Sequence, residues 1–247
     1  IMRIDILTLF PELINSVIKE SIIARAIESN KITINVINFR EFSNNKHKKV
    51  DDYPFGGGEG MLIGIQPIYD CLESIEKTDN TKIIMTSPQG STFNQKKAES
   101  LAKLDHLIII CGHYEGIDDR VNQYLVDEEI SVGDYVLTGG ELPALIIVDA
   151  VARLIPGVLK EKSHQNDSFS MKLLEHPQYT RPRDFKGMKV PEVLLSGNHK
   201  LIEEFKLKES LRNTYLKRPD LLKNYSLNEN EKKLLEEIIK EENDKNS

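Results

Sequence analysis

Three short apolar segments of this chain each lead directly into a loop rich in glycine or proline. The segments span residues 82–86, 107–111 and 126–131, and the loops span 87–90, 112–116 and 133–140. Parallel strands expose their carboxyl ends at one edge of a sheet, so the three loops are expected to form one ligand pocket. Few side chains there ionise. Backbone groups would therefore recognise a flat, neutral moiety such as adenine, beside Pro88, Val132 and Leu137.

The third loop continues into an apolar run at residues 145–154. Gly133, Gly139 and Gly140 allow tight turns or a close approach to a ligand. Pro143 suits the first turn of a helix. The stretch 131–144 therefore predicts the end of a strand, a ligand-binding loop and a buried helix.

The rest of the first two thirds alternates between strands and helices. Residues 2–9 and 32–39 alternate as strands do, with Ile4, Ile6 and Thr8 on one face, and residues 12–28 have helical spacing. Further helices are expected at 66–75, 94–104 and 117–124, and the long loop 40–64 is expected to be functional. These features predict an α/β domain over residues 2–159 with a mostly parallel sheet.

The last third has a different organisation. Residues 160–170 are polar and aperiodic, which predicts a flexible linker. Helical patterns at 200–212, 218–223 and 229–242 predict a small helical domain over residues 171–247.

Charge is distributed unevenly along the chain. The net charge of −6 over the whole chain argues against indiscriminate nucleic-acid binding. It divides into −8 over residues 1–159, +5 over 160–225 and −3 over 226–247, and the basic segment inside an acidic protein indicates a polyanion bound at one face. Residues 179–191 combine basic and aromatic side chains, as RNA contact requires.

Other classes of protein are disfavoured. No apolar run approaches the roughly 18 residues of a membrane span. Cys71 and Cys111 lie in apolar surroundings and form no disulfide or zinc pattern, which predicts buried thiols in a reducing, bacterial-type cytoplasm. No Walker A loop or dinucleotide fingerprint is present, which disfavours a generic nucleotide-binding protein.

Five motifs together resemble those of bacterial tRNA (guanine-37-N1) methyltransferases. They occupy residues 54–58 (PFGGG), 111–116 (CGHYEG), 133–143 (GDYVLTGGELP), 179–182 (YTRP) and 193–199 (VLLSGNH), and the resemblance runs in order from Met2 to about Glu242. Two positions depart from the family pattern: Glu59 stands where proline is common, and Gln178 where histidine is common.

The resemblance implies a fold, a cofactor and an assembly. The α/β domain would contain a deep trefoil knot at its C-terminal side, which base rates alone would not predict. The chain would form an obligate homodimer with active sites shared between subunits. S-adenosylmethionine would occupy the three-loop pocket, and its implied contacts are Ser87, Pro88, Gly112, Tyr114, Glu115, Val132, Gly133, Asp134, Tyr135, Val136, Leu137, Gly139, Gly140 and Pro143.

The resemblance also assigns roles in the reaction. N1 of guanine carries a proton, which a base must remove as the methyl group arrives. Asp167 in the motif Asp-Ser-Phe matches the family's base, and Arg153 matches an arginine that stabilises charge on O6. Glu115 matches a position linked to a divalent cation, with Mg²⁺ as the candidate. The tRNA-binding residues implied are Ser168, Gln178, Tyr179, Arg181, Arg183, Asn198 and His199.

Two alternatives remain at this point. One is a knotted methyltransferase that acts on another RNA nucleotide, such as a ribose hydroxyl. The other is a non-catalytic dimeric RNA-binding module, which would bind tRNA without binding the cofactor.

Overall fold

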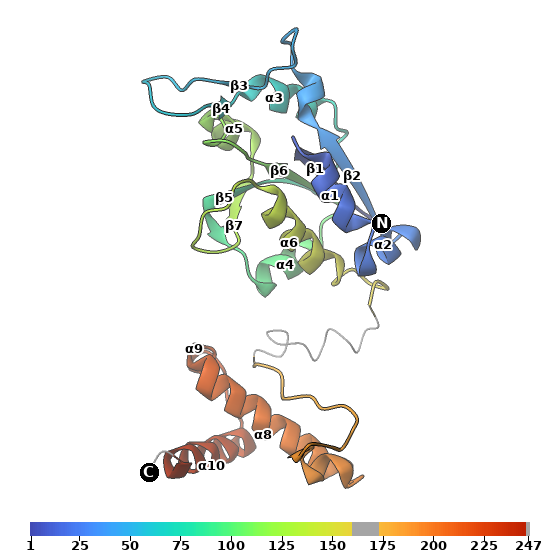
Figure 1. The fold of residues 1–247 in the computed structure, drawn as a ribbon, viewed down its shortest axis with the longest axis vertical. Coiled ribbons are helices and arrows are strands. Elements are labelled where there is room, and N and C mark those ends of the chain that lie inside the picture. Colours follow the sequence, from blue (N-terminus) through green and yellow to red (C-terminus); the bar gives the residue numbers. More distant parts are fainter. Residues whose placement is uncertain (160–172, 246–247) are drawn as a thin grey trace. The chain divides into compact units, whose positions relative to one another are not determined.

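The computed structural model describes residues 1–159 and 173–245. The chain divides into two compact units, Ile1–Glu161 and Lys162–Ser247 (Figure 1). The linker expected at 160–170 lies outside the described residues. Within those residues, no helix combines the length and apolar character needed to cross a membrane.

A five-stranded sheet forms the centre of the first unit. Its strand order is β2-β1-β6-β5-β7, and every neighbouring pair is parallel. The prediction of an α/β fold with a parallel sheet is therefore confirmed. The strands are β1 (Met2–Thr8), β2 (Ile32–Asn38), β5 (Thr81–Thr92), β6 (His106–Cys111) and β7 (Glu128–Ser131).

Helices cover both faces of the sheet (Figure 1). One face packs against α1 (Pro11–Ile18), α2 (Ser21–Glu28), α4 (Gln95–Leu101) and α6 (Glu141–Ala152). The other face packs against α3 (Ile65–Glu73), α5 (Asp119–Leu125) and the 3-10 helix η1 (Phe39–Phe42).

The residue pattern of the strands follows from this layering. On β1, Ile4 and Ile6 face one core while Leu7 faces the other. Every residue of β6 is buried, as expected for a central strand covered on both faces. The apolar run at 107–111 is therefore the signature of the middle of the sheet.

The helix expected at 12–28 is two helices, so that prediction is wrong as a single element. α1 ends at Ile18 with Lys19 as its C-cap, Glu20 is extended, and Ser21 has a positive φ of 57°. Both helices turn apolar residues toward the same core, for example Ile18 and Ile23. The shared apolar face explains why the spacing looked continuous.

The strand expected at 82–86 is also longer than predicted. β5 continues to Thr92 and pairs with β7 before and after an irregularity between Thr86 and Ser91. Gly90 packs so tightly there that a Cβ would lie 2.5 Å from the Glu129 carbonyl carbon. The predicted loop 87–90 is thus an interruption within a strand.

The long segment 40–64 carries some structure of its own. It contains most of η1 and a small antiparallel pair, β3 (Asp51–Asp52) with β4 (Leu62–Ile63). Gln66 holds the first part of the segment in place, because the side-chain amide of Gln66 donates to the Phe42 carbonyl at 2.7 Å. The intervening glycine-rich stretch is mostly exposed.

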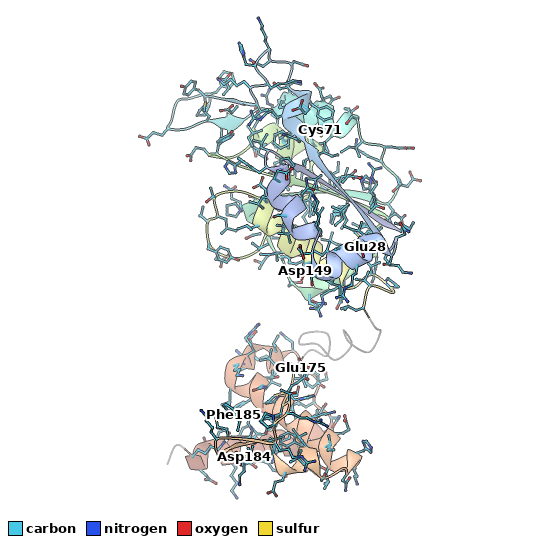
Figure 2. The ribbon with its side chains drawn as sticks, turned by 45° about the vertical axis from the view of Figure 1, so that its right-hand side comes forward. Glu28, Cys71, Asp149, Glu175, Asp184 and Phe185 are labelled. Atoms are coloured by element: carbon cyan, nitrogen blue, oxygen red, sulfur yellow. The ribbon has the colours of Figure 1, made fainter. Side chains whose placement is uncertain are left out.

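The second unit is small and helical around a core of Leu173, Leu211, Leu234 and Ile238. Its elements are β8 (Asp184–Phe185), β9 (Met188–Lys189), the 3-10 helix η2 (Glu192–Leu195), α8 (His199–Lys217), α9 (Pro219–Lys223) and α10 (Glu229–Lys245). The sequence did not predict the β8–β9 hairpin. Figure 2 marks it by Asp184 and Phe185, and Phe185 is half exposed.

Candidate functional site

A cavity of about 270 Å³ opens beside the irregular part of β5 and beyond the ends of β6 and β7. The prediction that the three loops meet at one sheet edge is confirmed, since all three contribute to its wall. The lining residues are Met85, Thr86, Ser87, Pro88, Gly112, His113, Tyr114, Glu115, Gly116, Ile117, Ile130, Ser131, Val132, Gly133, Tyr135, Val136, Leu137, Thr138, Gly139, Gly140 and Pro143.

Gly140 brings the third loop against the end of β6. Its amide donates to the Gly112 carbonyl at 2.8 Å, and its carbonyl accepts from the Thr86 hydroxyl at 3.3 Å. A Cβ on Gly140 would lie 2.2 Å from the Thr86 Oγ1 and 2.8 Å from the Cys111 Cα. Only glycine fits at this crossing of three segments.

The loop after β6 is fastened to the glycine-rich segment 56–61. The Glu115 amide donates to the Met61 carbonyl at 3.2 Å, and the Ile63 amide donates to the Gly116 carbonyl at 2.9 Å. Gly60 packs on the Glu115 side chain, where a Cβ would lie 2.3 Å from the Cγ. The segment 56–61 therefore packs against Glu115 in the pocket wall, although none of its own residues lines the pocket.

Tyr114 holds an unusual backbone conformation in this wall, with a φ of 58°. Non-glycine residues rarely adopt positive φ, and such positions concentrate at ligand sites. The Tyr114 side chain is 43% exposed, so it is available to a ligand.

The lining contains few charged groups but many backbone donors and acceptors. Glu115 is its only carboxylate among the described residues. Apolar side chains such as Ile130, Val132 and Leu137 complete the wall. Such a cavity can bind a flat, largely neutral ligand by hydrogen bonds to the main chain and by apolar contact.

Cys111 lies directly behind this wall at the end of β6 and is fully buried. Burial raises the pKa of the Cys111 thiol well above its ordinary value, and the nearby Glu141 carboxylate raises this pKa further. A thiol reacts as a thiolate, so Cys111 is an inert packing residue and not a nucleophile.

Comparison with known proteins identifies the family. Residues 2–224 match the family model described as tRNA (Guanine-1)-methyltransferase TrmD. The chain belongs to the tRNA (guanine-1)-methyltransferase family. It is thus an enzyme that methylates N1 of a guanine in tRNA, and this activity implies S-adenosylmethionine as the methyl donor.

Individual tRNA (guanine-N1) methyltransferases align along nearly their whole length. The relative from Anoxybacillus flavithermus is 57% identical over 244 residues, covering 98% of this chain and all of the relative. The Bacillus subtilis relative is 57% identical over 243 residues, covering 97% of this chain and all of the relative. The Geobacillus kaustophilus relative is 58% identical over 242 residues, covering 97% and 99%. Each is called a tRNA (guanine-N(1)-)-methyltransferase.

Family membership excludes the ribose target and the non-catalytic module among the alternatives drawn from the sequence. A guanine N1 methyltransferase is neither a ribose methyltransferase nor a non-catalytic RNA-binding module. The resemblance stated from the five motifs is confirmed.

The pocket brings together the residues that the resemblance implied for the cofactor, with one exception. Asp134 is not among the lining residues, although its neighbours Gly133 and Tyr135 are. Both neighbours are held locally, since the Tyr135 hydroxyl donates to the Val132 carbonyl at 3.3 Å and the Tyr135 main-chain amide donates to the Gly133 carbonyl at 2.9 Å.

Arg153, the one described residue with an implied catalytic role, is not among the lining residues. Arg153 caps the C-terminal end of α6, whereas Gly140 at the other end of that helix lines the pocket. The 12 residues of α6 separate the two by about 18 Å. Asp167 lies outside the described residues, as does Ser168.

The described tRNA-binding candidates belong to the helical unit. Tyr179 is 48% exposed, and Arg181 and Arg183 are also exposed. Asn198 has a structural role at the start of α8, because its side chain accepts from the Leu201 amide at 3.3 Å. His199 is the first residue of that helix. The side-chain amide of Gln178 donates to the Glu175 carboxylate.

Sequence reasoning missed several lining residues. Thr86 and Ser131 are examples. Thr86 and Ser131 are the last regular residues before their loops, so the rule that ligands bind beyond strand ends could have included them. His113 lies within the predicted pocket loop 112–116, although it was not among the individual contacts implied for the cofactor.

Proposed function

We propose that this enzyme methylates N1 of guanosine 37 in the tRNA anticodon loop, in the cytoplasm, using S-adenosylmethionine bound in the three-loop pocket. The observation that carries this proposal is the cavity itself. It supplies main-chain donors and acceptors for the adenine and apolar side chains around it. Position 37 comes from the motif resemblance.

Asp167 acts as the general base in this proposal. It takes the proton from N1 of guanine while N1 attacks the methyl carbon, and the methyl–sulfur bond breaks with its electron pair remaining on sulfur. Arg153 stabilises the negative charge that develops on O6.

The position of Arg153 supports an active site shared between two chains. Arg153 lies about 18 Å from the start of its own α6 and does not line its own pocket. In a homodimer it would serve the pocket of the partner chain.

An exposed apolar surface supports the homodimer. Leu13 and Val17 on α1, and Leu142 and Ile146 on α6, are each 41–53% exposed. Residues four apart share one face of a helix, and α1 and α6 are in contact. Together they form an apolar face, here called the α1–α6 face, that a second copy would cover.

The knot belongs to the proposal as well. The chain after β7 returns to the end of β6, where the Gly140 amide bonds to the Gly112 carbonyl. This close return is compatible with a chain threaded through its own loop, which the family resemblance implies for the C-terminal part of the α/β domain.

Only one described residue, Glu115, supports the assignment of a magnesium ion. Glu115 lines the pocket and is the right type of ligand for Mg²⁺. The described residues contain no group of three or more His, Cys, Asp or Glu side chains that could hold a metal ion. They do not form a metal cage, so no step of the reaction is assigned to a metal.

The two-domain division completes the proposal. Residues 2–159 bind the cofactor and dimerise, residues 160–170 link the domains, and residues 171–247 bind tRNA. Gln178, Tyr179, Arg181, Arg183, Asn198 and His199 would contact tRNA from the helical unit, with Ser168 from the linker. Exposed arginines and an exposed tyrosine suit phosphate contact and base stacking.

Methyl transfer from labelled S-adenosylmethionine to two tRNA transcripts tests this function. One transcript carries G at position 37 and the other carries A. We expect label only in the first, mapped to N1. Equal labelling of both transcripts would place the target guanine elsewhere in tRNA.

Asp167→Asn tests the base in the same assay. We expect unchanged cofactor binding and a loss of turnover of about 10²- to 10⁴-fold, the usual contribution of a general base. Turnover close to that of the unmodified enzyme would exclude Asp167 from this role.

A further inference from the structure

His113 has one buried nitrogen without a hydrogen bond. Its Nδ1 is fully inaccessible and finds no hydrogen-bond partner among the described residues. The nearest acidic atom, Oε2 of Glu141, lies 3.9 Å away, which is too far for a hydrogen bond. Buried polar atoms are nearly always satisfied, so this exception needs an explanation.

Glu141 is itself buried, with only 4% of its surface exposed. Its other oxygen, Oε1, accepts from the Thr8 hydroxyl at 2.7 Å. The same Thr8 oxygen accepts from the Phe10 amide at 2.9 Å. A buried carboxylate is thus held in place from the end of β1 while its second oxygen faces His113.

The ring of His113 is packed on two sides. Its centroid lies 4.5 Å from the Phe10 ring and 5.2 Å from the Tyr114 ring, the latter edge-on. Thr8, Phe10, His113 and Glu141 therefore form a closed circuit of contacts, here called the clasp. It joins the end of β1, the loop after β6 and the start of α6.

The clasp adjoins the pocket through Gly139. A Cβ on Gly139 would lie 2.5 Å from the His113 Nδ1 and 2.6 Å from the Glu141 Oε2. The main chain of Gly139 thus rests against both side chains, and Gly139 and His113 both line the pocket. The ring of His113 also packs against Tyr114. The positive φ of Tyr114 needs support from its surroundings.

We propose that His113 is a positioning residue for the methyl donor: held by Glu141 and Phe10, it fixes Tyr114 and Gly139 in the conformation that the cofactor requires. This inference rests on the proposed cofactor site. When the pocket is filled, a shift of about 1 Å would bring the His113 Nδ1 within hydrogen-bond distance of Glu141 and satisfy both groups.

The experiment compares variants of the full-length enzyme by calorimetric titration with S-adenosylmethionine and by steady-state kinetics. His113→Ala removes the whole side chain. His113→Phe keeps the ring contacts but loses the nitrogen, and His113→Gln keeps a donor but loses the ring. Glu141→Gln keeps an acceptor for Thr8 and removes the charge.

We expect His113→Ala to raise the Kd and the KM for S-adenosylmethionine about tenfold or more, with a smaller change in kcat at saturating cofactor. His113→Phe and His113→Gln should each recover part of the loss. The double variant His113→Ala with Glu141→Gln should lose less than the product of the single losses, because both act through one contact.

His106→Gln is the matched control. His106 is buried at the opposite end of β6, and its Nε2 lies 2.9 Å from a buried carboxylate, Asp5. The loss of the His106 imidazole should lower the thermal stability of the enzyme without a change in the Kd for S-adenosylmethionine.

Two results would overturn the inference. One is an unchanged Kd in all three His113 variants. The other is a fall in kcat with no change in Kd, which would place His113 in the chemical step. Failure of the proposed cofactor site would be visible separately, since Gly140→Ala, which crowds the pocket wall, would then leave the Kd for S-adenosylmethionine unchanged.

Discussion

At the scale of single residues, Gly140 shows how closely the pocket depends on one missing side chain. Gly140→Ala would force a Cβ against main-chain atoms of Cys111 and Gly112, both 2.8 Å away. Main-chain atoms cannot move to another rotamer to avoid the added Cβ, as the atoms of a flexible side chain can. We expect a loss of stability of about 1–3 kcal/mol, typical of overpacking, and weaker binding of S-adenosylmethionine. Thermal unfolding and calorimetric titration measure the two effects.

Gly64→Ala is the matched control for this substitution. Gly64 also adjoins main chain, but a Cβ there would lie 3.6 Å from the Val50 carbonyl oxygen, an ordinary contact. Stability and cofactor binding should therefore change little. Equal losses in Gly64→Ala and Gly140→Ala would show that the crossing at Gly140 is not special.

The same positions show what sequence can predict about single residues. Gly139 and Gly140 were expected at a ligand site because glycine permits close approach. What each glycine approaches could not be predicted, since the partners Thr86, Cys111 and His113 are distant in sequence. Glu141 was read only as part of a motif, because its burial depends on packing against β1.

At the scale of secondary-structure elements, the proposed homodimer depends on the α1–α6 face. Ile146 is 45% exposed on α6, among apolar neighbours on both helices. Ile146→Asp would place a charge in the proposed dimer interface, and desolvating that charge is costly. We expect light scattering to show monomers at concentrations where the unmodified enzyme is dimeric. Activity should fall with the dimer.

Tyr124→Asp provides the comparison for Ile146→Asp. Tyr124 is 76% exposed on α5, which packs on the opposite face of the sheet. A charge there should leave the dimer intact. A dimeric Ile146→Asp variant would exclude the α1–α6 face as the interface.

Helices and strands were predicted well where the local sequence pattern determines them. They were predicted poorly where pairing with a segment distant in the sequence determines them. The buried strand at 107–111 and the helices of the second unit followed from apolar spacing. The extension of β5 to Thr92 depends on pairing with β7, which no local pattern reports. The break at Ser21 and the β8–β9 hairpin depend on single backbone conformations, such as the positive φ of Lys186 and Gly187.

At the scale of the whole molecule, the proposed site combines groups that one chain does not bring together within its described residues. The pocket lies at one end of α6 and Arg153 at the other. The expected base, Asp167, follows the first unit in sequence. A site shared between chains has a consequence that two inactive variants can reveal when mixed, because the subunits of a symmetric dimer are interchangeable.

Gly140→Ala impairs the pocket, and Asp167→Asn removes the base. A heterodimer of these chains would pair the intact pocket of one with the intact Asp167 of the other, giving one working site of two. After random exchange of subunits, the mixture should recover about a quarter of the normal activity, since half of the dimers are mixed. Distinct affinity tags on the two chains verify that heterodimers form. Purified heterodimers without activity would mean that each chain supplies its own base.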